Sequence, residues 1–113
     1  MEIVGHEPNK TNLGYHYLDD SGKHQASILR FMGPDFSADR HVFAAAWEPG
    51  LIAWFVDGIQ RYRVASKYVP SKPMHPIANL AVGGGTNNWV GAPDASTPFP
   101  SYYEVDYIRV WQR

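Results

Sequence analysis

Apolar and polar side chains alternate along much of this 113-residue chain, and a period of two residues predicts β-strands rather than helices. In residues 41–47, His41, Phe43 and Trp47 fall on one face and smaller side chains on the other. Residues 51–56 are apolar on both faces, which is typical of a strand buried between two layers. The predicted strands, about eight, are residues 1–4, 12–18, 26–31, 41–47, 51–56, 59–65, 77–82 and 102–111.

Turn sequences separate the central strands. Glu48-Pro49-Gly50 combines a proline that presets φ with a glycine that accepts a positive φ. Asp57-Gly58 is a two-residue hairpin signal, so residues 41–65 are predicted to form a three-strand meander. Residues 19–22 (DDSG) predict a further turn.

The strand pattern covers the whole chain, so residues 1–113 are predicted to form one all-β domain, an antiparallel sandwich or jelly roll. Residues 70–76 and 83–100 are predicted to be long loops rich in glycine, proline and polar side chains. Loops of that length are often functional.

Composition and charge exclude several classes of function. The chain has no cysteine, which excludes disulfides and thiolate chemistry. A formal net charge of −1 without a basic run argues against nucleic acid and membrane surfaces as partners. No apolar run approaches the roughly 20 residues that span a bilayer, and no signal peptide is recognised at the start.

Histidines and glycines give little catalytic signal. No two of the five histidines have metal-binding spacing on one predicted element, so a catalytic metal site is not expected. No serine lies in a G-x-S-x-G motif, and the glycines at 83–85 lack the lysine and helix of a phosphate loop.

The four tryptophans fall into two groups. Trp47, Trp54 and Trp111 lie in predicted strands, where packing in the core is favoured over contact with a ligand. Trp89 lies in a polar loop, where either contact with a sugar ring or a structural role is expected.

An ordered set of motifs over nearly the whole chain resembles the C-terminal half of a glycoside hydrolase family 16 domain of the laminarinase or β-1,3(4)-glucanase type. The motifs are residues 1–5 (MEIVG), 15–17 (YHY), 35–39 (DFSAD), 47–50 (WEPG), 52–58 (IAWFVDG), 79–84 (NLAVGG), 93–100 (PDASTPFP) and 104–110 (EVDYIRV). This resemblance implies a concanavalin A-like jelly roll, of which the chain carries about half. It also implies a neutral β-glucan as substrate and an extracellular or periplasmic location.

The resemblance gives Glu2 the role of catalytic acid/base. The catalytic strand of this subgroup reads E-x-D-x-x-E, and Met1-Glu2 matches its last two positions. The nucleophile and the intervening aspartate would precede residue 1. Because a retaining glycosidase needs two carboxyl groups, we expect the 113-residue chain to be inactive alone.

Other residues carry over from the family as expectations. His16, Asn79, Trp89 and Trp47 are predicted to bind substrate, and Asp106 matches a calcium ligand of many members. No cofactor is expected to be required, apart from a structural calcium ion. The alternative function is a non-catalytic carbohydrate-binding or assembly module on the same fold. A half-domain would leave strand edges unpaired, so a complementary N-terminal segment or self-association is expected.

Overall fold

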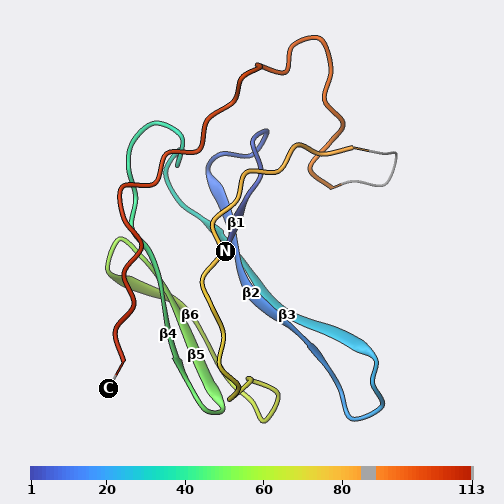
Figure 1. Cartoon of the computed structure of the whole chain (residues 1–113), viewed down its shortest axis with the longest axis vertical. Helices are drawn as coiled ribbons and strands as arrows, with labels where there is room; N and C mark the ends of the chain where they lie inside the picture. The colour runs from blue at the N-terminus through green and yellow to red at the C-terminus, as the bar shows by residue number, and fades with distance from the viewer. Residues whose placement is uncertain (85–88, 113) are drawn as a thin grey trace. The chain divides into compact units, whose positions relative to one another are not determined.

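The computed structural model describes residues 1–84 and 89–112 and shows an all-β protein with six strands and no helix in those ranges (Figure 1). Two compact units divide the chain, residues 1–73 and residues 74–113, and all six strands belong to the first. The strands are β1 (Glu2–Ile3), β2 (Lys10–Leu18), β3 (His24–Met32), β4 (Phe43–Glu48), β5 (Leu51–Val56) and β6 (Ile59–Ala65).

The first sheet has the order β1-β2-β3, with both pairs antiparallel. The β2–β3 register runs without interruption from the pair Lys10–Met32 to the pair Leu18–His24. The predicted turn after residue 18 is confirmed, because the carbonyl of Asp19 accepts a hydrogen bond of 2.8 Å from the backbone of Gly22. Gly22 has φ of 78°, a conformation that glycine adopts without strain.

The second sheet is the predicted meander, β4-β5-β6. The β4–β5 loop consists of Pro49 and Gly50, and Gly50 has φ of 75°. The β5–β6 loop consists of Asp57 and Gly58, both with positive φ, as a type I′ hairpin turn requires. The carboxylate of Asp57 also accepts a hydrogen bond from the backbone of Val42, and this bond lowers its pKa. The predicted turns and hairpins of residues 41–65 are therefore confirmed.

The core lies between the two sheets. Leu13 of β2, Trp54 and Val56 of β5, and Phe36 of the β3–β4 connection are buried together. Across the sheets, Ser27 and Tyr62 share a hydrogen bond of 2.8 Å between their hydroxyl groups. Burial of Trp54 confirms its predicted core position, and the two packed sheets confirm the predicted sandwich class.

The second unit, residues 74–113, corrects two predictions. Residues 77–82 and 102–111 were predicted as strands, but the structure shows no strand among the described residues of this unit. A strand needs a neighbour to receive its backbone hydrogen bonds, and alternation in the sequence cannot supply one. Trp111, predicted in the core, is 79% exposed for the same reason. The third glycine of the 83–85 run and the loop residues 86–88 lie outside the described residues.

Candidate functional site

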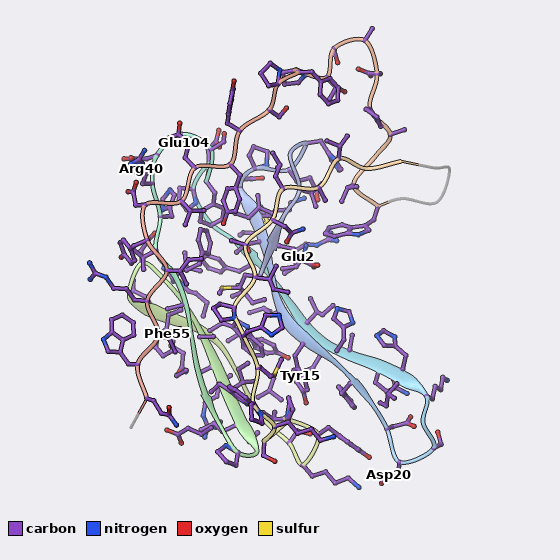
Figure 2. All side chains as sticks on the ribbon, viewed as in Figure 1. Glu2, Tyr15, Asp20, Arg40, Phe55 and Glu104 are labelled. Carbon is purple, nitrogen blue, oxygen red and sulfur yellow. The ribbon has the colours of Figure 1, made fainter. Side chains whose placement is uncertain are left out.

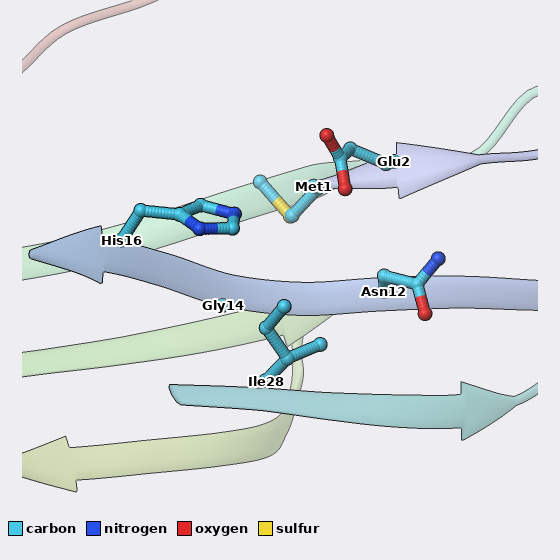
Figure 3. A pocket seen from close by; sticks show the side chains of 6 residues that line it. All are labelled: Met1, Glu2, Asn12, Gly14, His16 and Ile28. Atoms are coloured by element: carbon cyan, nitrogen blue, oxygen red, sulfur yellow. The ribbon is translucent and has the colours of Figure 1, made fainter. Parts of the chain in front are cut away.

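A hollow of about 200 Å³ opens on the outward face of the first sheet (Figure 3). In the close-up, the ring of His16 points along the sheet toward the side chain of Met1, and the carboxylate of Glu2 lies beyond it. The hollow is lined by Met1, Glu2, Asn12, Gly14, His16 and Ile28.

Strand alternation and register build this hollow. Thr11, Leu13 and Tyr15 of β2 point toward the core (Tyr15 is labelled in Figure 2). The even-numbered residues of β2 therefore face outward. Glu2 pairs with Asn12 across β1 and β2, which brings the carboxyl and the amide to the same face. Sheet geometry therefore places Glu2, Asn12 and His16 on one surface.

Gly14 lies at the bottom of the hollow, where the absence of a side chain leaves space between β2 and β3. A β-carbon built on it would lie 2.4 Å from the backbone oxygen of Ser27 and 2.7 Å from the side chain of Ile28. This space cannot open easily, because the Ser27 oxygen is backbone and the Cα of Ile28, also backbone, would lie 2.9 Å from the same β-carbon. Glycine at position 14 thus lets β3 pass close to β2 while the outward face stays open.

The polar groups of the hollow are one carboxyl group, one amide and one imidazole. Glu2 is the one carboxylate among its lining residues, within the part of the chain that the structure describes. A carboxyl can donate a proton to a glycosidic oxygen, and an amide and an imidazole can bind sugar hydroxyls. The retaining mechanism needs a second carboxyl about 5–5.5 Å from the first, which these lining residues do not provide.

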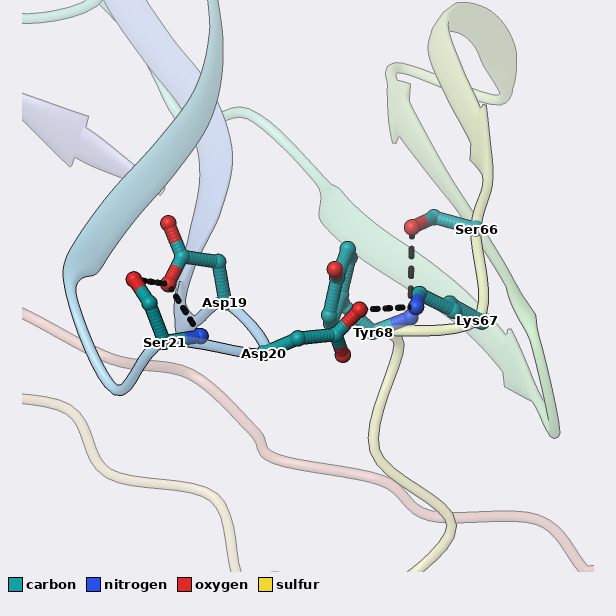
Figure 4. Close-up of polar contacts among 6 residues, drawn as sticks. All are labelled: Asp19, Asp20, Ser21, Ser66, Lys67 and Tyr68. Carbon is teal, nitrogen blue, oxygen red and sulfur yellow. Dashed lines mark hydrogen bonds and ion pairs between the residues drawn. The ribbon is translucent and has the colours of Figure 1, made fainter.

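The far end of the β2–β3 hairpin is held by charged contacts (Figure 4). Hydrogen bonds from the Ser21 hydroxyl, Gln25 and the backbone of Lys23 lower the pKa of Asp19 to about 2. The neighbouring Asp20 forms an ion pair with Lys67, in the segment after β6. These contacts fix the tip of the hairpin whose middle forms the floor of the hollow.

Aromatic rings continue from the core toward the same hairpin tip. Trp54 stacks on Tyr62 with centroids 5.1 Å apart and on Tyr15 at 6.4 Å. Tyr15 stacks on Tyr17, which stacks on Tyr68 at 4.8 Å. The inward face of β2 is thus packed by a row of aromatic rings, which leaves its outward face free for polar side chains.

The structure brings together only part of the predicted site. Glu2 and His16 share the hollow, as the resemblance implies. Trp47 lies elsewhere, on β4 of the second sheet, where its indole N–H donates a hydrogen bond of 2.7 Å to the carbonyl of Pro70. Trp47 is 38% exposed, so its favoured core position is wrong, and its contact with substrate stays a prediction.

The remaining predicted residues belong to the second unit. Asn79 is exposed and does not lie on a strand, contrary to its predicted position on a strand facing the cleft. Trp89 lies in a turn and is 54% exposed, in agreement with its predicted loop position. The described residues contain no group of three or more His, Cys, Asp or Glu side chains that could hold a metal ion. Asp106 is exposed in the second unit, and its role as a calcium ligand stays a prediction.

Sequence reasoning missed two polar residues of this face. Asn12 could have been found by counting in steps of two from His16. His24 lies across the hairpin from His16, with their nearest ring nitrogens 3.0 Å apart. No spacing on one strand reveals that pair, because it depends on the register of two strands.

The described residues contain no helix with the length and the apolar character that crossing a membrane requires.

Comparisons with known proteins identify the family of the chain. The family model of glycosyl hydrolases family 16 matches residues 1–109. The chain therefore belongs to glycosyl hydrolase family 16. It is 32% identical over 109 residues to a beta-glucanase of Paenibacillus polymyxa, and 32% identical over 104 residues to a xylanase/beta-glucanase of Ruminococcus flavefaciens.

The matched region is only part of each relative. It covers 96% of this chain but 43% of the Paenibacillus polymyxa protein, and 92% of this chain but 12% of the Ruminococcus flavefaciens protein. The chain thus spans less than half the length of the curated relatives it matches. No solved structure matches the chain significantly.

Proposed function

We propose that this chain is the part of a β-glucan hydrolase that carries the catalytic acid/base, Glu2. The observation that carries the proposal is the shared hollow of Glu2, Asn12 and His16 on the outward face of a sheet in a family 16 chain. The beta-glucanase relatives support a β-glucan as the substrate class. The β-1,3 or mixed β-1,3-1,4 linkage is proposed from the motif resemblance.

In the proposed mechanism, Glu2 protonates the leaving glycosidic oxygen and later activates water, while a second carboxylate forms the covalent intermediate. That nucleophile is proposed to come from residues before position 1. Asn12 and His16 bind hydroxyl groups of the sugar that Glu2 faces. Alone, the 113 residues are proposed to bind glucan without cleaving it.

The proposal extends to partners and location. Exposed apolar side chains in residues 77–82 and 102–111 support pairing with a complementary N-terminal segment or a second copy. A polymeric substrate supports an extracellular or periplasmic location. Asp106 is proposed as a calcium ligand only where further oxygen ligands come from beyond this chain, and no step of the mechanism uses the ion.

The decisive experiment is the DNA sequence that precedes the codon of Met1. We expect it to continue in frame and to encode Glu-x-Asp-x directly before Met1-Glu2. In the resulting longer protein, Glu2→Gln should abolish the release of reducing sugar from mixed-linkage glucan while glucan binding persists. Undiminished hydrolysis by that variant would overturn the role of Glu2.

The alternative function is a non-catalytic carbohydrate-binding or assembly module. The observation that favours it is the single carboxylate among the lining residues of the hollow. An in-frame stop codon close before Met1, together with glucan binding that survives Glu2→Gln, would establish this alternative instead of the hydrolase.

A further inference from the structure

Two histidines face each other on the outward side of the β2–β3 hairpin. Nδ1 of His16 lies 3.0 Å from Nε2 of His24, the ring centroids are 5.1 Å apart, and the ring planes differ by 14°. Both side chains are exposed. They are diagonal neighbours, because His16 pairs with Ala26 while His24 pairs with Leu18.

We propose that His16 and His24 together bind a divalent transition-metal ion of the Cu²⁺, Ni²⁺ or Zn²⁺ kind. Imidazole nitrogens bind such ions at about 2.0–2.1 Å, so two nitrogens in adjacent coordination positions lie roughly 2.9–3.4 Å apart. The observed separation of 3.0 Å falls in that range. Rotation of the two exposed rings, without movement of the backbone, directs both lone pairs at one ion.

The hairpin holds the two ligands in place. The β2–β3 register has no bulge between Lys10–Met32 and Leu18–His24, and Asp19 fixes the turn that follows. Preorganised ligands lose little conformational entropy when the ion binds, which favours the bound state. Water completes the coordination shell, because both rings lie at the surface.

Without metal, the two nitrogens share one proton in an N–H···N hydrogen bond. When the ion binds, the donor ring changes to its other neutral tautomer: its proton moves through solvent to the second ring nitrogen, and the freed lone pair binds the ion. Imidazole suits copper, nickel and zinc, and the affinity order among divalent ions predicts that Cu²⁺ binds most tightly. This inference goes beyond the proposed glucan hydrolysis and does not depend on it, since it needs no sugar and no second carboxylate.

The test is calorimetric titration of the full 113-residue chain with CuCl2, NiCl2 and ZnCl2 in a non-coordinating buffer. We expect one ion per chain, with Cu²⁺ bound most tightly. His16→Ala and His24→Ala should each weaken binding at least about tenfold, because each variant removes one of two ligands. His6→Ala and His75→Ala are the matched controls and should change the affinity less than about twofold.

Electron paramagnetic resonance of the Cu²⁺ form provides a second measurement, in which two coordinated nitrogens are expected. Circular dichroism checks that both variants keep the strand content of the wild type. Failure of the wild type to bind any of the three ions at millimolar concentration would overturn the proposal. So would unchanged affinity in both His16→Ala and His24→Ala. Because His24 does not line the hollow, loss of metal binding in His24→Ala with retained glucan binding separates the two proposals.

Discussion

Residues 1–73 and residues 74–113 both show strand-like alternation interrupted by glycine and proline, but the six strands found among the described residues all lie in the first region. In the first region each strand has a neighbour, and the two sheets bury Leu13 and Trp54 between them. In the second region Tyr102 and Trp111 are each 79% exposed. Alternation decides which face of a strand is buried, whereas a neighbouring strand decides whether the strand forms.

The largest expected effect of this difference is on stability. Leu13→Ala, in the core of the first region, should lower the free energy of unfolding by about 2–5 kcal/mol through lost burial and a cavity. Leu80→Ala, where the side chain is 54% exposed, should change it by less than about 0.5 kcal/mol. Urea unfolding followed by tryptophan fluorescence measures both. Equal losses in the two variants would show that the second region has a core of its own.

Glycine substitutions test whether the backbone is more closely packed in the first region than in the second. Gly14→Ala should cost about 1–3 kcal/mol, because its β-carbon would lie 2.4 Å from the Ser27 carbonyl oxygen. Gly84→Ala is the matched control in the second region, since a β-carbon there meets no atom within 4 Å. Thermal unfolding of the two variants should separate them clearly. A stable Gly14→Ala protein would contradict the close approach of β2 and β3.

A smaller effect is expected for the hydrogen bond between the sheets. Tyr62→Phe removes the hydroxyl that meets Ser27 and should destabilise the protein by about 1 kcal/mol. The double variant Tyr62→Phe with Ser27→Ala should lose little more than the single variant, because the bond is already absent. Fully additive losses in the double-mutant cycle would mean that the two hydroxyls do not interact.

The smallest expected effect concerns two similar turns, Asp19–Ser21 and Asp94–Ser96. In each, the aspartate carboxylate accepts hydrogen bonds from the backbone and hydroxyl of the serine two residues on, and each aspartate pKa is lowered. Only Asp19 is also bonded by a strand side chain, Gln25, and its pKa falls to about 2 from 3.8.

A pH dependence follows from the lowered pKa of Asp19. Because the folded pKa lies below the unfolded one, the stabilisation is fully present above about pH 4 and is lost as the pH falls toward 2. Gln25→Ala should raise the pKa of Asp19 and leave that of Asp94 unchanged. Carboxyl carbon NMR titration measures both values. An unshifted Asp19 pKa in that variant would exclude the contribution of Gln25.

Much of the first region was predictable from the sequence. The turns at Pro49–Gly50 and Asp57–Gly58 demand positive φ at the glycine, and their spacing sets the register of β4, β5 and β6. Glu2 and His16 were predicted from the family resemblance, and the β1–β2 register brings them to one face. Local chemistry thus accounts for the hairpins, whereas the prediction of Glu2 and His16 depended on the resemblance to a family.

The rest depended on information that no single strand carries. The contact of His16 with His24 follows from the register of two strands. The hydrogen bond from the Trp47 ring to the carbonyl of Pro70 joins residues 23 positions apart, which no local pattern reveals. Residues 77–82 were predicted as a strand because the pattern cannot report whether a partner exists.

The outward face of the first sheet, around Glu2, Asn12 and His16, is the surface that we propose binds β-glucan. The most direct test is NMR titration of the ¹⁵N-labelled chain with a soluble mixed-linkage glucan oligosaccharide. We predict saturable shift changes at the amides of these three residues and of Gly14, with little change in β4–β6. Absence of any change, or changes confined to β4–β6, would contradict the claim.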